Sequence, residues 1–169
     1  MSNSVNTKDT PTNSYLTFQM NQEHFAVSVT KVTELLEMLP VTRVPKSPDF
    51  MRGVINLRGA VVPVVDTRIK FSLTPAPDTI DTCIVVMNIL MEHDSVKVGA
   101  IVDSVSEVLE VADEKILPLP SIGNKTRALF IDGVIKLDEK FIMVLNVDKV
   151  FNNEEIISLN TEASISHED

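Results

Sequence analysis

The chain contains an internal repeat, and this repeat constrains its fold more than any other feature. Segments 25–37 and 98–110 lie 73 residues apart and share the pattern Val-x-x-Val-x-Glu-x-Leu-Glu. Segment 53–57 recurs 80 residues later as 133–137, and 61–71 matches 141–151 at that same offset. Shared Val and Gly content alone does not easily reproduce three matches in one order, so the pattern indicates a duplication.

The repeated units are rich in strand signals. Near-continuous apolar runs at 60–65, 83–87, 96–102 and 141–147 are typical of strands buried on both faces. Pro and Gly residues fall between these runs, as expected for short strands joined by turns. We therefore predict an all-β fold of two similar units of roughly 65–75 residues, each marginal alone. The seam where they pack together is a natural place for a partner to bind.

Three regions follow from the composition. Residues 1–13 form a polar leader that we predict to be disordered, and 154–169 form a polar, acidic tail. The domain itself spans 14–153.

The longest apolar stretch, 83–91, is too short for the ~20 residues that a membrane-spanning helix needs. Cys83 is the single cysteine, so no internal disulfide can form. These features predict a soluble, cytoplasmic protein.

Several kinds of chemistry are disfavoured. A net charge of −9 repels nucleic acids and anionic membranes. Segment 123–126 lacks the Gly-Lys-Ser/Thr ending of a phosphate-binding loop. The three histidines, His24, His93 and His167, show no metal-ligand spacing. We find no paired nucleophile and base, and therefore predict no catalytic residues, no metal and no cofactor.

Segments 41–45, 53–59 and 62–68, with Pro48, and also 32–35 and 99–108, closely resemble the signature of a known family, the CheW-like domain. The resemblance extends from Tyr15 to Phe151. There are departures: Lys46 and Ser47 stand where an Asn-Ala pair is common, and Thr67 replaces a usual Leu.

This resemblance implies a fold of two intertwined five-stranded SH3-like β-barrels. It also implies a non-catalytic adaptor in two-component chemotaxis signalling. The expected partners are the regulatory domain of a CheA-type histidine kinase and the cytoplasmic tip of methyl-accepting receptors, in membrane-bound receptor arrays. The same domain occurs inside the kinase and in CheV-type proteins. The few residues that follow Phe151 favour a standalone adaptor.

The resemblance also implies a receptor-binding groove. It places Val32 and Glu34 there, with the neighbouring Leu35, and it favours a receptor contact for Arg58 beside Gly59. The alternatives are a solvated arginine in a turn, and a short amphipathic segment whose valine and leucine are buried. The repeat partners of Val32 and Leu35 are expected on the opposite wall of the groove by symmetry; they are Val105 and Val108.

A kinase-binding surface is predicted at Phe50, Met51, Arg52 and Gly53, in the Pro-rich region of the first unit. The alternative is that these residues form a hydrophobic plug under the loop. Two other functions stay open at this point. One is a CheW-type adaptor for another kinase pathway, such as surface motility or second-messenger control. The other is a β-barrel that binds a small molecule.

Overall fold

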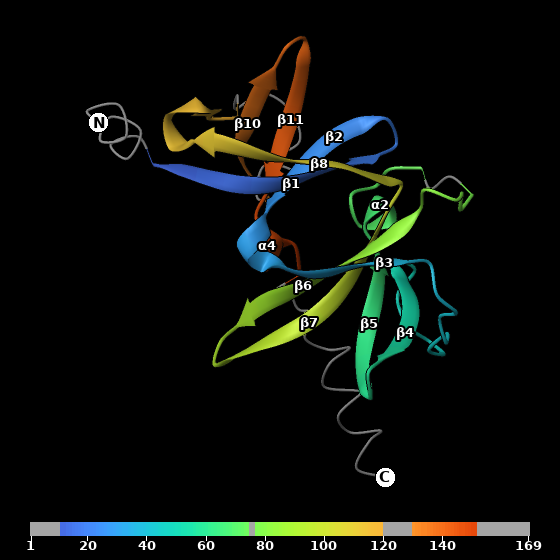
Figure 1. Ribbon diagram of the computed structural model, residues 1–169. Helices are drawn as coiled ribbons and strands as arrows, with labels where there is room; N and C mark the ends of the chain where they lie inside the picture. The colour runs from blue at the N-terminus through green and yellow to red at the C-terminus, as the bar shows by residue number, and fades with distance from the viewer. Residues whose placement is uncertain (1–10, 75–76, 120–129, 152–169) are drawn as a thin grey trace.

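The computed structural model describes residues 11–74, 77–119 and 130–151 (Figure 1). Its strands form a six-stranded sheet in the order β8-β1-β2-β11-β10-β9 and a five-stranded sheet in the order β3-β6-β7-β5-β4. The first sheet contains β1 Thr12–Met20, β2 Glu23–Ser28, β8 Ser104–Ala112, β9 Ile116–Leu117, β10 Ile131–Leu137 and β11 Lys140–Leu145. The second contains β3 Val32–Glu37, β4 Met51–Leu57, β5 Ala60–Asp66, β6 Cys83–Met91 and β7 Asp94–Val102. The helical elements are α2 Thr67–Lys70, α4 Val147–Phe151 and the 3-10 turns Val29–Lys31 and Asp113–Lys115.

The chain passes twice between the two sheets. Strands β1 and β2 belong to the six-stranded sheet, β3 to β7 build the other, and β8 to β11 return to the first. The N-terminal hairpin therefore completes a barrel whose other strands come from the C-terminal half (Figure 1). The prediction of an all-β fold with two intertwined SH3-like barrels is confirmed.

The duplication is visible in the strand pairing. Each barrel contains one parallel pair: Val64 of β5 lies beside Gly99 of β7, and Val144 of β11 lies beside Ala26 of β2. These partners are related by the same 80- and 73-residue offsets as the sequence repeat. A short helix follows the second strand of each equivalent hairpin, α2 after β5 and α4 after β11. The repeated segments thus occupy equivalent places in the two barrels.

The two sheets differ in strand number because of one edge. Leu117 of the two-residue strand β9 pairs with Val134. At the equivalent place in the other barrel, Thr42 forms a single bridge with Val54, with N–O distances of 2.9 and 2.8 Å. Both edges come close to an equivalent glycine. A Cβ atom on Gly53 would lie 2.2 Å from the Thr42 carbonyl oxygen.

This close approach leads to a stability prediction. Gly53 has φ +150°, so Gly53→Ala adds both backbone strain and a clash with Thr42. We expect it to lower the free energy of unfolding by about 1–3 kcal/mol, measured by urea denaturation. Gly59→Ala is the matched control, since φ is +88° there but no atom lies within 4 Å of the new Cβ. An equal loss in both variants would contradict the role of the Thr42 contact.

An apolar cluster of the described residues joins the barrels. It contains Phe18, Phe25 and Val27 from the six-stranded sheet and Val85 and Ala100 from the other. The aromatic rings of Phe18 and Phe25 stack with centroids 6.0 Å apart. We call this cluster the central core. Burial of apolar surface on both sides makes each barrel depend on the other. In the described part of the chain, no helix is long and apolar enough to cross a membrane.

Candidate functional site

The turn between β4 and β5 presents Arg58 to solvent. Arg58 and Gly59 both have positive φ, +50° and +88°, as in the two-residue hairpin turns that match strand twist. The Asn56 side chain accepts a hydrogen bond from the Gly59 amide at 2.8 Å, which fixes the turn. The Arg58 side chain, at the tip, is 69% exposed. Gly59 therefore allows the backbone conformation that this turn requires.

Arg58 is paired with Glu34 rather than free. Both terminal guanidinium nitrogens donate to the Glu34 carboxylate, with Nη1 to Oε2 at 3.3 Å. The Arg58 hydrogen bond is the main cause of a lowered pKa at Glu34, and the positive charges of Arg58 and Lys97 contribute. Glu34 lies on the edge strand β3, and Arg58 directly follows β4, the strand at the other edge of the sheet, so the pair links β3 to the β4–β5 turn.

The predicted apolar site residues divide into two groups. Val32 and Val105 are half-buried and pack against the central core from opposite barrels. Leu35 and Val108 are exposed, at 48% and 56%, on the edge strands β3 and β8. Leu35 is therefore not a core residue, contrary to the alternative in which it is buried. The structure brings Glu34 and Arg58 into contact, whereas Val105 and Val108 lie on a strand of the other sheet.

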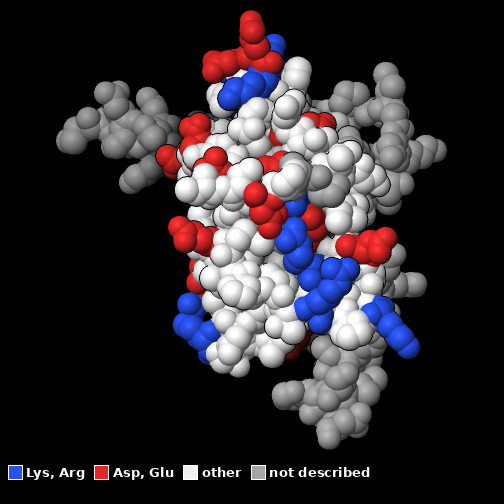
Figure 2. Space-filling model, turned by 90° about the vertical axis from the view of Figure 1, so that its right-hand side faces the viewer, with Lys and Arg blue, Asp and Glu red and all other residues white. Residues whose placement is uncertain are grey.

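The predicted kinase-binding residues are mostly covered. Phe50 and Met51 are buried, and the Lys70 ammonium lies 4.6 Å from the centroid of the Phe50 ring. Gly53 faces Thr42, so the plug described by the alternative is the observed arrangement for these residues. Arg52 alone presents a partly exposed side chain. Figure 2 shows that basic side chains gather on the face where β4 and α2 lie, next to acidic ones.

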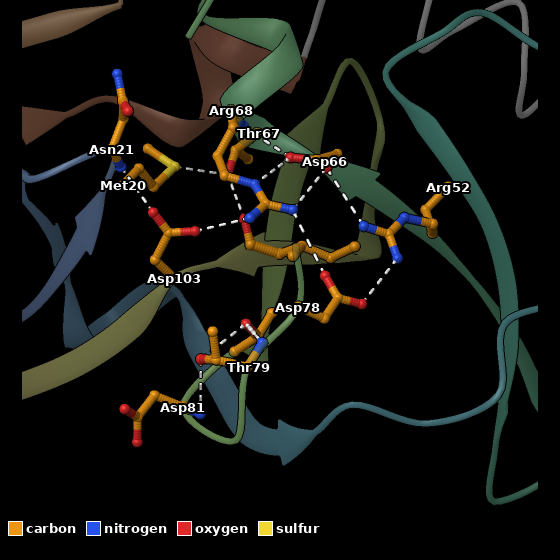
Figure 3. Close-up of polar contacts among 12 residues, drawn as sticks. Met20, Asn21, Arg52, Asp66, Thr67, Arg68, Asp78, Thr79, Asp81 and Asp103 are labelled. Carbon is orange, nitrogen blue, oxygen red and sulfur yellow. Dashed lines mark hydrogen bonds and ion pairs between the residues drawn. The ribbon is translucent and has the colours of Figure 1, made fainter. Parts of the chain in front are cut away.

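A buried ionic cluster, which the sequence analysis missed, lies beside this loop (Figure 3). Arg68 is 1% exposed and makes a bidentate contact with Asp66, with Nε–Oδ1 and Nη2–Oδ2 both 2.9 Å. Its Nη1 donates to Asp103 Oδ1 at 2.7 Å. Arg52 contacts Asp66 at 3.4 Å and Asp78 at 3.3 Å. The Asp-x-Arg spacing was the available signal, but it does not indicate burial.

The charges of this cluster depend on each other. Burial acts to raise the pKa of Asp66, but the hydrogen bonds and positive charge of Arg68, together with Arg52, lower it overall. Asp66 Oδ1 also accepts the Arg68 amide at 3.1 Å and so caps α2. A paired, fully hydrogen-bonded guanidinium is the form in which a buried arginine is tolerated. The cluster is therefore a structural feature of the first barrel.

The second barrel carries an apolar hollow that the sequence analysis also missed. Its volume is about 550 Å³, and its lining includes the exposed side chains of Leu117 and Phe141. Phe141 is the repeat partner of Val61, which is itself 67% exposed. Contiguous exposed apolar surface often marks a protein-binding region.

Comparison with known proteins identifies the family. A family model described as the CheW-like domain matches residues 14–155. The chain belongs to the CheW family. It is 34% identical to the probable chemotaxis protein CheW of Rhizobium etli over 140 residues, which are 83% of this chain and 88% of the relative. It is 31% identical to the chemotaxis protein CheW of Klebsiella aerogenes over 149 residues, covering 88% and 87%.

A solved CheW structure has the same architecture. The scaffolding protein TtCheW from Thermoanaerobacter tengcongensis matches with a TM-score of 0.75 and 27% identity, covering 86% of this chain and 91% of that one. CheW family proteins are scaffold or adaptor proteins rather than enzymes. The prediction that this chain is not an enzyme is confirmed on that ground.

Proposed function

We propose that this chain couples methyl-accepting chemotaxis receptors to a CheA-type histidine kinase, as a cytoplasmic adaptor recruited to membrane-bound receptor arrays. The observation that carries the proposal is the exposed Arg58–Glu34 pair, placed on the rim of the first barrel in a protein of the CheW family. Leu35, on the same strand as Glu34, adds exposed apolar surface, so β3 carries both charged and apolar side chains, as protein interfaces do.

The receptor side is built around Arg58. A guanidinium has five donors, so a pair with Glu34 leaves some of them for a carboxylate or carbonyl of a receptor helix. Leu35 on β3 supplies exposed apolar surface on the same barrel. Val32 and Val105 border the central core at the seam, and Val108 adds exposed surface on the second barrel. Gly59 holds the turn that presents Arg58.

The kinase side is proposed at the first barrel's Arg52 face. Phe50, Met51 and Gly53 would support this face from beneath, because their positions are covered. The apolar hollow beside Phe141 is a second surface where a barrel of the kinase could pack. Two partners that bind one rigid body can influence each other through it, and avidity in an array raises modest affinities.

An adaptor role in another kinase pathway would use the same surfaces, and it is the second candidate for that reason. A small-molecule role is less well supported. Among the described residues, the small cavity in the central core is lined by apolar side chains and by Thr67, whose hydroxyl already donates to the Ile101 carbonyl at 2.7 Å. A ligand site would need several polar groups that converge on it.

Binding assays with purified partners test the proposal. We expect the full chain to pull down both a receptor cytoplasmic fragment and a CheA-type kinase. An unrelated β-barrel protein of similar acidity serves as the negative control. Binding to neither partner would contradict the chemotaxis role, and the other histidine kinases of the same cell would then be the candidates to assay.

A further inference from the structure

Two ion pairs occupy similar positions in the two barrels. Arg68, the second residue of α2, contacts Asp103 at 2.7 Å. Asp148, the second residue of α4, contacts Lys31 at 2.6 Å. Arg68 and Asp148 are 80 residues apart, the offset of the duplication. Asp103 and Lys31 lie in the two segments where the chain crosses between the sheets. The 73-residue offset relates Lys31 to Ser104, the neighbour of Asp103, so the two pairs correspond, with reversed charge, to within one residue.

Each pair also reaches a hairpin of the other barrel. Asp103 Oδ2 accepts a hydrogen bond from the backbone N–H of Asn21, in the β1–β2 turn, at 2.7 Å. Asp148 Oδ1 accepts one from the Leu90 amide, near the end of β6, at 2.8 Å. Each set therefore links the helix of one barrel, a crossing segment and a hairpin of the other barrel. We call them the Arg68 clamp and the Lys31 clamp.

The two clamps can fix the angle between the barrels, which the central core cannot do by itself. Apolar packing is non-directional, so it holds the barrels together without strongly selecting one angle between them. Charge-assisted hydrogen bonds have defined geometry. Two such contacts in separate crossing segments, each tying both barrels together, restrict rotation of one barrel against the other.

The two clamps differ in strength. Arg68 is 1% exposed and is also held by Asp66. In the Lys31 clamp, both side chains are about one-third exposed, at 30% and 28%. Exposed pairs are weak and are screened by salt, whereas buried ones are much less so. The Lys31 clamp is therefore the weaker of the two and the more sensitive to salt.

Lys31 directly precedes β3, the strand that carries Val32, Glu34 and Leu35. We propose that Lys31 and Asp148 are positioning residues, which hold β3 and the receptor surface at a defined angle to the second barrel. The proposed link to receptor binding rests on the function proposed above, but the control of the angle does not.

A distance measurement between the barrels tests the clamp directly. Spin labels at Ser95→Cys on β7 and Lys136→Cys on β10, in a Cys83→Ala background, report one distance distribution by pulsed electron resonance. We expect Lys31→Glu to shift or broaden it, and the swap Lys31→Glu/Asp148→Lys to restore it in part. The restoration is partial because the Leu90 amide loses its Asp148 acceptor. Lys115→Glu, an equal charge change on an exposed lysine, should leave the distribution unchanged.

An unchanged distribution in Lys31→Glu would overturn the proposal. If that variant fails to fold, Lys31→Gln and Asp148→Asn remove the pair without creating repulsion, and the same comparison decides. Receptor affinity is the second readout. We expect Lys31→Glu to weaken binding of the receptor fragment about two- to fivefold, as for loss of an exposed ion pair, and the swap to recover part of it.

The outcomes separate this inference from the proposed function. A changed distance distribution with unchanged receptor affinity would overturn the positioning role while leaving receptor binding intact. If wild type itself binds no receptor fragment, the proposed function fails, and with it the positioning role. The distance measurement would then still decide whether the clamp controls the angle.

Discussion

Replacing Arg68 by methionine is expected to lower the free energy of unfolding by about 3–5 kcal/mol, the usual cost of removing one partner of a buried ion pair. Methionine fills similar space but leaves the carboxylate of Asp66, 3% exposed, without its bidentate partner. It also removes the contact with Asp103 and thus one inter-barrel clamp. Urea denaturation followed by circular dichroism measures the change.

Arg52→Met is the matched control. Arg52 also contacts Asp66, but its side chain is 31% exposed, so we expect a loss of less than about 1 kcal/mol. Similar losses in the two variants would show that burial of the guanidinium does not determine its contribution.

The dependence of stability on pH should also change in Arg68→Met. In the wild type, the pKa of Asp66 is lowered in the folded state. Its contribution is therefore fully present above the unfolded pKa of about 3.9 and is lost as pH falls toward the folded value. Without Arg68, burial would raise that pKa, so stability should instead decrease as pH rises above about 4.

Arg58→Glu is expected to weaken binding of the receptor fragment at least about tenfold, because like charges at an interface are strongly unfavourable. The new carboxylate also repels Glu34, its former partner. Because the position is exposed, we expect the free energy of unfolding to change by less than about 1 kcal/mol. Titration calorimetry gives the affinity, with Lys115→Glu as the charge-matched control.

The charge swap Glu34→Arg/Arg58→Glu separates two explanations. It restores an ion pair of reversed direction between β3 and the hairpin turn. If the pair only holds the barrel closed, the swap should recover receptor affinity. If the receptor contacts the Arg58 guanidinium itself, as we propose, affinity should stay low.

Much of the fold could be predicted because the relevant signals are local. The run at 53–59 predicts a strand that ends in a glycine turn, and β4 and its turn form there. The repeat predicted two similar β units, and the family resemblance implied that these units are barrels. The offsets of the repeat also match the register of the parallel strand pairs, which no local pattern encodes. The edge that differs, a single bridge at Thr42 in one barrel and β9 in the other, depends on how the connecting segments lie.

The interactions that the sequence did not reveal are long-range. Asp103 lies 35 residues beyond Arg68, and neither residue carries a pattern that marks it as half of a buried pair. Phe50 and Met51 are apolar residues in a loop, and composition alone does not tell a contact surface from a plug. In both cases, burial depends on which distant segments pack against these residues, and that is determined only when the two barrels are assembled.

The most direct test of the adaptor role is a co-sedimentation assay that contains receptor fragment, kinase and this chain together. Wild type should carry the kinase into the receptor-containing pellet, whereas Arg58→Glu should bind the kinase in solution but leave it in the supernatant. If the kinase fails to sediment with the receptor when wild type is present, although each binary complex forms, the chain does not couple its partners and the account is contradicted.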